Sequence, residues 1–279
     1  MSSITATPTR DTTLSTPAVP FTATLVSEWD KLVTVRSTWI TLALAAMLSI
    51  GTTALFAWVT GWSWGEWSAA DRAAFDPIEF SFVGTMFSTI LFIVLGVGMV
   101  TSEYSSGMMR LTMMATPKRS RVLLAKAVIV TAVMLVVGTL INIANFLTAQ
   151  AIFGAYDLPT VTLGDSDAFR VVVLGVGLTG PVFPLIGMAL AFIFRSTALA
   201  ITAVLALMFA PSFFGELLPR RWQEDVLAWL PGQAADSFAI GHLYPDSPMY
   251  LDPALGLVVA IGWLVLFISG AWLALNRRD

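Results

Sequence analysis

The chain has 279 residues, of which 57% are hydrophobic and only 12% are charged, a balance typical of a membrane protein rather than a soluble domain. It contains no cysteine, which excludes disulfides, thiolate nucleophiles and cysteine metal sites, and its one histidine, His242, excludes any site that needs two imidazoles. The formal net charge of -3 says little, because in such a chain the positions of the charges matter more than their sum.

The first twenty residues, MSSITATPTRDTTLSTPAVP, are rich in Ser, Thr and Pro and have no apolar core. This composition cannot bury enough apolar surface to offset the entropy of ordering the chain. It therefore predicts a disordered cytosolic tail over residues 1–20, and it lacks the apolar stretch of a cleavable signal peptide.

Residues 21–36 have two chemically different faces. Glu28, Asp30 and Lys31 fall on one side of a helix drawn through this segment. Apolar residues recur at helical spacing on the other side: Phe21, Leu25, Trp29, Leu32 and Val33. We expect an amphipathic helix that lies in the inner membrane interface, with Trp29 at headgroup depth. A cytosolic extension of the first span is the alternative.

Six apolar stretches are long enough to cross a hydrocarbon core of about 30 Å, which takes about 20 helical residues. They lie at 39–60, 80–101, 122–149, 170–194, 197–216 and 254–275. Only Arg195 and Ser196 separate the fourth stretch from the fifth, which predicts a tight helical hairpin. The sequence thus predicts an all-α integral membrane protein with six transmembrane helices in one domain, residues 21–279.

Lysine and arginine set the orientation of such a bundle. Eleven of the 15 basic residues fall on the side that holds both termini and the 101–121 loop, which predicts that this side faces the cytosol. On the outer side, Trp62, Trp64 and Trp67 suit the aromatic belt of the membrane interface. The long outer connection, residues 217–253, predicts short helices that either gate the bundle or simply pack on it.

The interiors of the predicted spans contain no Asp, Glu, His or Arg. Lys126 and Arg170 are near span ends, from which we expect their side chains to reach the interface. Proton- or sodium-coupled transporters and intramembrane hydrolases usually need ionisable groups at depth, so both classes are disfavoured. The chain also lacks the G-x-x-x-x-G-K-[ST] pattern that binds ATP phosphates. Uphill transport would therefore take its energy from a partner protein.

The loop TSEYSSGMMRLTMMATPKRSR, residues 101–121, combines a helical pattern with a basic cluster. Four apolar residues recur at helical spacing, and Pro117 ends the run: Tyr104, Met108, Leu111 and Ala115. We expect a short amphipathic helix at about 103–116 that projects into the cytosol and docks on a partner. For the basic residues alone, membrane topology and contact with anionic lipids are the alternative: Lys118, Arg119 and Arg121.

Two asparagines and two phenylalanines are candidates for contact with a cargo. Asn142 and Asn145 lie one turn apart in the third span, roughly 30 Å above its cytosolic end at about 1.5 Å per residue. They either line a cargo path or, as is commoner, form hydrogen bonds to neighbouring helices. Phe183 and Phe213 add aromatic surface that suits an apolar or amphipathic molecule, although such residues more often only pack. In the fourth span, LGVGLTGPVFPLIG predicts a kink, either flexible or fixed.

Several motifs taken together resemble those of a known family. They are Glu103-Tyr104-x-x-Gly107-x-x-Arg110, Pro117-x-Arg119-x-Arg121 and Ala125-Lys126, followed by IGMALAFIFRSTALA at 186–200 and WLPGQAADSFA at 229–239. This pattern is similar to that of ABC-2 type permeases, the membrane subunits of type-2 ATP-binding-cassette exporters. The resemblance covers most of the chain, and one departure is that family members often carry Gly-Thr where this chain has Gly107-Met108.

The resemblance implies a fold and a set of partners. Two permease chains would pair, as a homodimer or with a sister permease, above two cytosolic ATPase subunits that bind ATP and Mg²⁺. The chain itself would hold no cofactor or metal, would bind no nucleic acid and would not be an enzyme. The helix at 21–36 would be the connecting helix, and the loop helix would be the coupling helix. The residues implied to contact the ATPase or to brace that helix are Glu103, Tyr104, Gly107, Met108, Arg110, Leu111, Pro117, Arg119 and Arg121.

The sequence therefore predicts the permease subunit of an ATP-driven exporter in the cytoplasmic membrane. Its cargo would be a hydrophobic or amphipathic compound, such as a drug, an antibiotic or a peptide-like molecule. A non-transporting membrane anchor, whose loop recruits a cytosolic partner, is the competing hypothesis. An intramembrane enzyme is disfavoured because the predicted spans hold no catalytic groups at depth.

Overall fold

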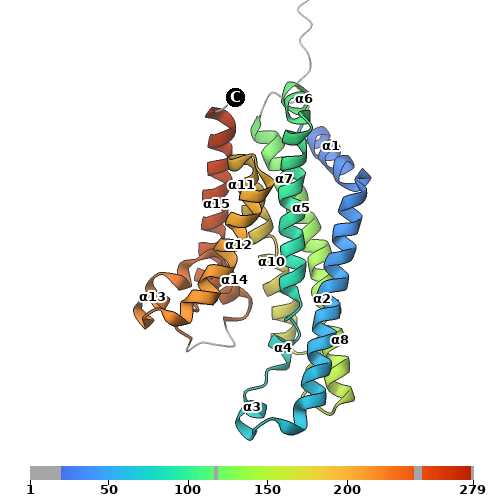
Figure 1. Ribbon diagram of the computed structural model, residues 1–279, viewed down its shortest axis with the longest axis vertical. Helices are drawn as coiled ribbons and strands as arrows, with labels where there is room; N and C mark the ends of the chain where they lie inside the picture. Colours follow the sequence, from blue (N-terminus) through green and yellow to red (C-terminus); the bar gives the residue numbers. More distant parts are fainter. Residues whose placement is uncertain (1–19, 116–118, 242–246, 278–279) are drawn as a thin grey trace, which may run out of the picture.

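The computed structural model describes residues 20–115, 119–241 and 247–277, and within these ranges every regular element is a helix. The long helices run roughly side by side along the longest axis of the molecule (Figure 1). The prediction of an all-helical chain with six helices long and apolar enough to cross a membrane is confirmed. Most of the predicted tail, Pro117, Lys118 and His242 lie outside the described residues.

Four of the six spanning segments are unbroken helices. They are α2 (Arg36–Ser63), which continues into the 3-10 turn η1 (Trp64–Glu66), α5 (Thr85–Ser105), α12 (Thr197–Phe214) and α15 (Pro253–Arg277). At the hairpin between the fourth and fifth segments, Arg195 takes a left-handed conformation with φ of 54°. Ser196 then accepts a hydrogen bond from the Leu199 amide, which caps α12.

The other two spanning segments contain π-helical stretches, which often occur at functional sites. The third consists of α7 (Arg119–Val133), the π-helix η2 (Met134–Gly138) and α8 (Thr139–Ala155). The fourth consists of α9 (Ser166–Phe169), the π-helix η3 (Arg170–Gly175), α10 (Val176–Thr179) and α11 (Val182–Phe194). The helix breaks at Gly180 and Pro181, where the Gly/Pro pattern predicts a kink, because proline lacks the amide that helix continuation needs.

The first helix, α1 (Phe21–Thr34), is shorter than the predicted helix 21–36. Val35 is extended, with φ of -84° and ψ of 118°, so Arg36 already begins α2. One residue departs from the predicted faces: Glu28, expected on the polar side of the helix, is buried. Trp29, expected at headgroup depth, is about half exposed.

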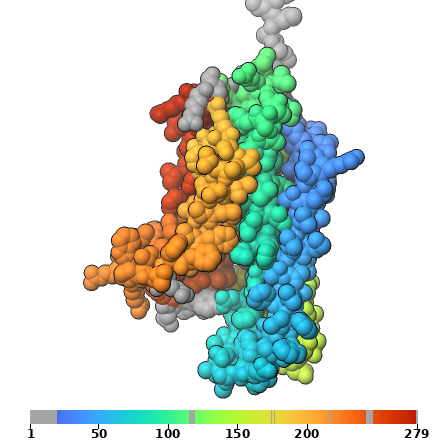
Figure 2. Space-filling model, in the orientation of Figure 1, coloured from blue at the N-terminus to red at the C-terminus, as the bar shows by residue number. Residues whose placement is uncertain are grey.

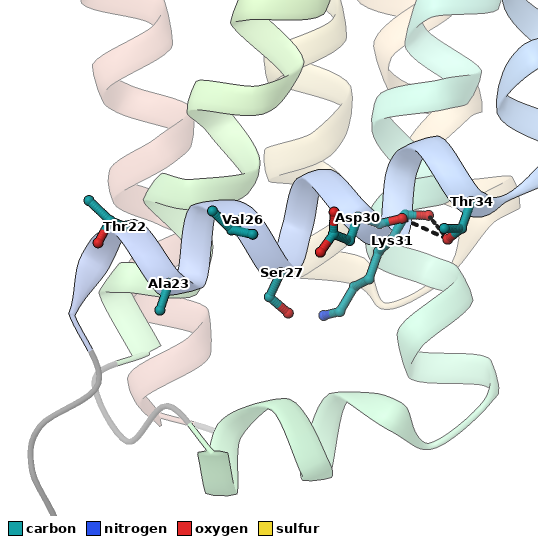
Figure 3. Close-up of a pocket in the computed structure, with 7 residues that line it drawn as sticks. All are labelled: Thr22, Ala23, Val26, Ser27, Asp30, Lys31 and Thr34. Atoms are coloured by element: carbon teal, nitrogen blue, oxygen red, sulfur yellow. Dashed lines mark hydrogen bonds between the residues drawn. The ribbon is translucent and has the colours of Figure 1, made fainter.

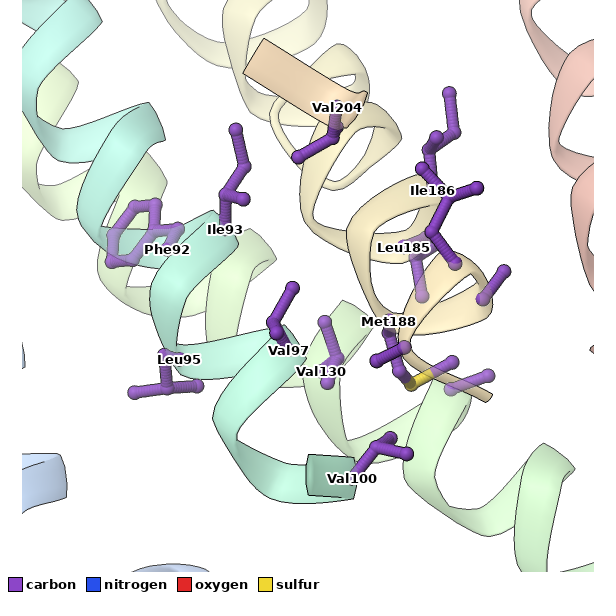
Figure 4. Packing of buried hydrophobic residues seen from close by; sticks show 14 of the residues in the cluster. Phe92, Ile93, Leu95, Val97, Val100, Val130, Leu185, Ile186, Met188 and Val204 are labelled. Carbon is purple, nitrogen blue, oxygen red and sulfur yellow. The ribbon is translucent and has the colours of Figure 1, made fainter. Parts of the chain in front are cut away.

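The core is centred on the contact between α5 and α11. A β-carbon added to Gly96 of α5 would lie 2.8 Å from the carbonyl oxygen of Pro184 of α11, so only glycine permits this approach. Figure 4 shows Val97 of α5 beside Val130 of α7, and both Val97 and Ile93 lie against Gly187 of α11. A small residue at position 96 therefore permits close packing of α5 on α11.

At the end of the molecule far from the C-terminus, two short helices cover α2 and α8. They are α3 (Ala69–Ala73) and α4 (Pro77–Phe80), capped by the side chains of Ser68 and Asp76 respectively. Aromatic rings with centroids about 5–6 Å apart fill the space beneath them: Trp64, Trp67, Phe75, Phe80 and Phe153.

The connection between α12 and α15 forms a second group of short helices. These are η4 (Gly215–Leu217), α13 (Arg220–Asp225), η5 (Leu227–Trp229) and α14 (Pro231–Ala239). The orange segment around α13 projects from the side of the bundle (Figure 2). By contrast, α14 lies tightly against α15, where a β-carbon on Gly256 would be 2.6 Å from the Ala234 carbonyl oxygen. The indole of Trp263 also donates to the Trp229 carbonyl at 2.7 Å.

Candidate functional site

A short helix, α6 (Met108–Ala115), connects α5 to α7 at the end of the bundle where the C-terminus lies (Figure 1). The chain turns sharply before it, because Gly107 adopts a left-handed φ of 71° that glycine tolerates best. The prediction of one helix over 103–116 is therefore wrong. Glu103 and Tyr104 belong to the last turn of α5, and the turn separates them from Met108.

The helix α6 presents an apolar face to its surroundings. Met109 is buried in the core, which anchors the helix to the bundle. On the outer side, Met108, Leu111 and Met114 are 41%, 65% and 78% exposed, at spacings of three residues, and Arg110 is exposed beside them. A contiguous exposed apolar face of this kind is typical of a protein-interaction surface.

Four charged residues meet where α1 crosses α5 and α7. Lys126 Nζ lies 2.6 Å from Glu28 Oε2 and 2.8 Å from Glu103 Oε1. Lys31 Nζ lies 2.7 Å from Glu28 Oε1 and 2.8 Å from Glu103 Oε1. We call this set, Glu28, Lys31, Glu103 and Lys126, the charge cluster. Two positive and two negative charges balance within it, and it ties three helices together.

The charge cluster corrects the prediction for Lys126 and gives Glu103 a bracing role. Lys126, expected to extend to the membrane interface, is 1% exposed and also donates to the Met99 carbonyl at 3.0 Å. Glu103 is equally buried, so its side chain braces α1 and α7 within this chain. Burial lowers the pKa of Lys31, but its hydrogen bonds to Glu103 and Glu28 outweigh that effect and hold the pKa above its usual value.

The remaining residues implied to contact an ATPase fall into two groups. Tyr104 and Arg119 bind within the chain: the Arg195 guanidinium carbon lies 5.1 Å from the Tyr104 ring centroid, and Arg119 Nη1 donates to the Leu275 carbonyl at 2.6 Å. Arg121 is half-buried. The outward-facing members of the set are on α6 or in the turn before it: Gly107, Met108, Arg110 and Leu111.

A shallow depression of about 740 Å³ follows α1 from Thr22 to Thr34. Figure 3 shows Ser27 and Lys31 pointing from α1 towards α6, and Lys31 Nζ donates to Thr112 Oγ1 of α6 at 3.4 Å. The depression and the apolar face of α6 therefore lie at the same end of the molecule.

A second hollow, which we call the cavity, lies in the half of the bundle away from α6 and has a volume of about 560 Å³. Its walls come from α4, α5, η2, α8, α10, α11, α12 and α14. Apolar side chains such as Phe92 and Met208 dominate, and a few polar groups, including Thr85, converge on it. This size and this mixture are typical of a small-molecule binding site.

Three of the four cargo candidates line the cavity: Asn142, Phe183 and Phe213. Asn145 has a different role, because it is fully buried and donates to Ser49 Oγ of α2 at 2.8 Å. It thus makes the hydrogen bond between helices that was the alternative for this residue. Asn142 also accepts a hydrogen bond from Thr85 Oγ1 at 3.4 Å on the cavity wall.

Two acids of the cavity wall were missed by the sequence reasoning, Glu79 on α4 and Asp236 on α14. Asp236 is exposed to the cavity, and the partial loss of water around its carboxylate there raises its pKa to about 6. The available signal was a single acid inside PGQAADSFA, a short and otherwise mostly apolar helix. Within the described ranges, no group of three His, Asp or Glu residues is placed to hold a metal ion.

Residues 39–279 match the family described as Protein of unknown function (DUF2705). The chain belongs to this family. The DUF2705 region contains α6 and every described residue of the cavity wall, whereas α1 precedes it. No curated protein matches the chain.

Proposed function

We propose that this DUF2705 protein is the membrane-spanning subunit of an ATP-driven exporter that moves a hydrophobic or amphipathic compound outward across the cytoplasmic membrane. The exposed apolar face of α6 carries the proposal. It would dock on a separate cytosolic ATPase that binds ATP and Mg²⁺, because the chain has no phosphate-binding motif of its own. Both termini would be cytosolic, and a second permease chain, identical or related, would complete the transporter.

The apolar side chains of α6 are more stable against a protein surface than in water, which supports docking on a protein. Exposed apolar surface costs about 25 cal/mol per Å² relative to burial, so a hydrophobic groove that covers Met108, Leu111 and Met114 would gain stability. Arg110 stands beside these residues and would add a charged contact at the rim. The depression on α1 extends the same surface, which would let one partner contact α1 and α6 together.

The fold also supports transmission of movement from α6 to the cavity. The helix α6 is joined directly to α5 and, through residues 116–118, to α7, and the charge cluster ties α1 to both. The helix α5 and the continuous α7–η2–α8 segment form two walls of the cavity at their other ends. A partner that displaces α6 would therefore shift both walls, and the cargo between them would experience a changed site.

The docking surface can be tested with charge substitutions on α6. We expect Leu111→Glu and Met114→Glu to abolish co-purification of a cytosolic ATPase from native membranes, as identified by mass spectrometry. Both variants should also lose any ATP hydrolysis that depends on this chain. Leu217→Glu is the matched control, since Leu217 is 80% exposed at the other end of the bundle. Unchanged ATPase association in the α6 variants would contradict the proposal.

A membrane anchor without transport is the second candidate, and the structural role of Asn145 favours it. If Asn142 and Asn145 both served only helix packing, the cavity wall would not change during ATP hydrolysis. Because the chain has no native cysteine, single cysteines at Asn142 and Asn145 can be labelled directly. Transport predicts ATP-dependent labelling at 142, with 145 inert throughout; an anchor predicts no dependence on ATP at either position.

A further inference from the structure

The cavity is lined mainly by apolar residues, but the charged residues on its described wall are all acidic. Its described lining includes two acids, Glu79 and Asp236, and no lysine or arginine. The acids are far apart in sequence and come from α4 and α14, so they share this space only because of the fold. Because the described wall offers no lysine or arginine to Asp236, the carboxylate of this residue favours a positively charged ligand.

Asp236 is the acid on which this attraction rests. Among the described residues, no cation or hydrogen-bond donor pairs with its carboxylate, and burial raises its pKa to about 6. The neighbouring titratable groups are Glu79 and Tyr250. Burial raises the pKa of Tyr250 to about 12, and the negative charges of Asp236 and Glu79 add to that effect. A cation in the cavity would therefore stabilise the charged form of Asp236, which burial disfavours.

The other walls suit the body of such a ligand. Phe92, Phe183 and Phe209 supply aromatic surface, whose faces attract organic cations as well as apolar groups. Thr85 and Asn142 add neutral hydrogen-bonding groups on the side formed by α5 and α8. A small inorganic ion would leave most of the volume of about 560 Å³ unfilled, whereas a multi-ring organic molecule would occupy it.

We propose that the cavity binds an organic monovalent cation, whose apolar or aromatic body contacts the phenylalanines and whose positive charge pairs with Asp236. The proposal specifies the chemical class of the cargo and to that extent rests on the proposed function, but binding itself requires neither ATP nor a partner. A ligand cation pairs with the ionised carboxylate alone, so binding displaces the proton from Asp236. Affinity should rise with pH through about 6 and fall below it.

Tetraphenylphosphonium is a suitable probe, because tetraphenylborate has nearly the same size and shape with the opposite charge. Equilibrium dialysis of radiolabelled probe against the purified chain in neutral lipid nanodiscs without ATPase, after subtraction of the uptake by empty nanodiscs, measures the binding of both probes. We expect the phosphonium to bind at least about tenfold more tightly than the borate at pH 7.5, and to bind about tenfold more weakly at pH 5.

Asp236→Asn should remove about tenfold of the phosphonium affinity and abolish the pH dependence. Asp225→Asn, an exposed acid of α13 in the same outer connection, is the matched control and should bind like the native chain. Equal binding of the two probes, or an unchanged Asp236→Asn affinity, would overturn the cation proposal and leave the exporter proposal standing. Phosphonium binding that depends on Asp236, without any ATP-driven transport, would support the cation proposal and overturn the exporter proposal. The pH profile of the native chain keeps the test decisive if a variant folds poorly.

Discussion

Lys126 is the residue whose loss should most weaken the end of the bundle where α6 lies. Its ammonium group is 1% exposed and has three partners, at 2.6 Å (Glu28), 2.8 Å (Glu103) and 3.0 Å (the Met99 carbonyl). In Lys126→Met, both carboxylates would stay buried and would share Lys31 alone, whose side chain is 28% exposed. Removing one partner from a buried ion pair costs about 3–5 kcal/mol, because the remaining charge is left uncompensated.

The assay is thermal unfolding of the purified chain in detergent, followed by tryptophan fluorescence. Lys126→Met should lower the unfolding temperature by roughly 10 °C. Arg110→Met, which removes an exposed cation from the same end, should change it by no more than about 2 °C. The double variant Lys126→Met/Glu28→Gln restores charge balance and should recover most of the loss. If the double variant were as unstable as the single one, the electrostatic explanation would be wrong.

Two further predictions concern packing and pH. Gly96→Ala should lower the unfolding temperature, because its β-carbon would press on the Pro184 carbonyl oxygen. The control is Gly98→Ala on the same helix, whose β-carbon meets nothing within 4 Å and which should be neutral or stabilising. Equal effects of the two substitutions would refute the close contact of α5 with α11. Because burial raises the pKa of Asp236 to about 6, the folded chain keeps this proton to higher pH than the unfolded chain, so stability should fall between about pH 4 and pH 6.5 as the pH rises. Asp236→Asn should remove that decline, and a decline of the same size in the variant would show that another group is responsible.

The turn at Gly107 illustrates how a local signal can be overlooked. Apolar spacing favoured one helix from residue 103, yet Ser105, Ser106 and Gly107 together are a helix-ending pattern. The glycine adopts a left-handed conformation and redirects the chain, so Glu103 points into the bundle while Leu111 points outward. Periodicity alone could not reveal this, because both arrangements place apolar residues at the same spacing.

No local sequence pattern could predict the charge cluster or the cavity. Glu28 and Lys126 are 98 residues apart, and Lys31 and Glu103 are 72 apart. A lysine near the end of a span is compatible with either an exposed or a paired position until its neighbours are known. Asp236 likewise gains its significance from the walls that α4, α5 and α12 supply around it.

The sequence by itself determined the helical class, the approximate limits of the six apolar helices and the short segments between them. These features depend on the cost of placing polar groups in hydrocarbon and on backbone hydrogen bonds within each segment, both of which are local. Only the tertiary structure decided which face of α1 is buried, which charges compensate one another and where the bundle leaves a hollow. Those outcomes depend on contacts between residues distant in the chain, and a one-residue rotation of a helix is enough to change them.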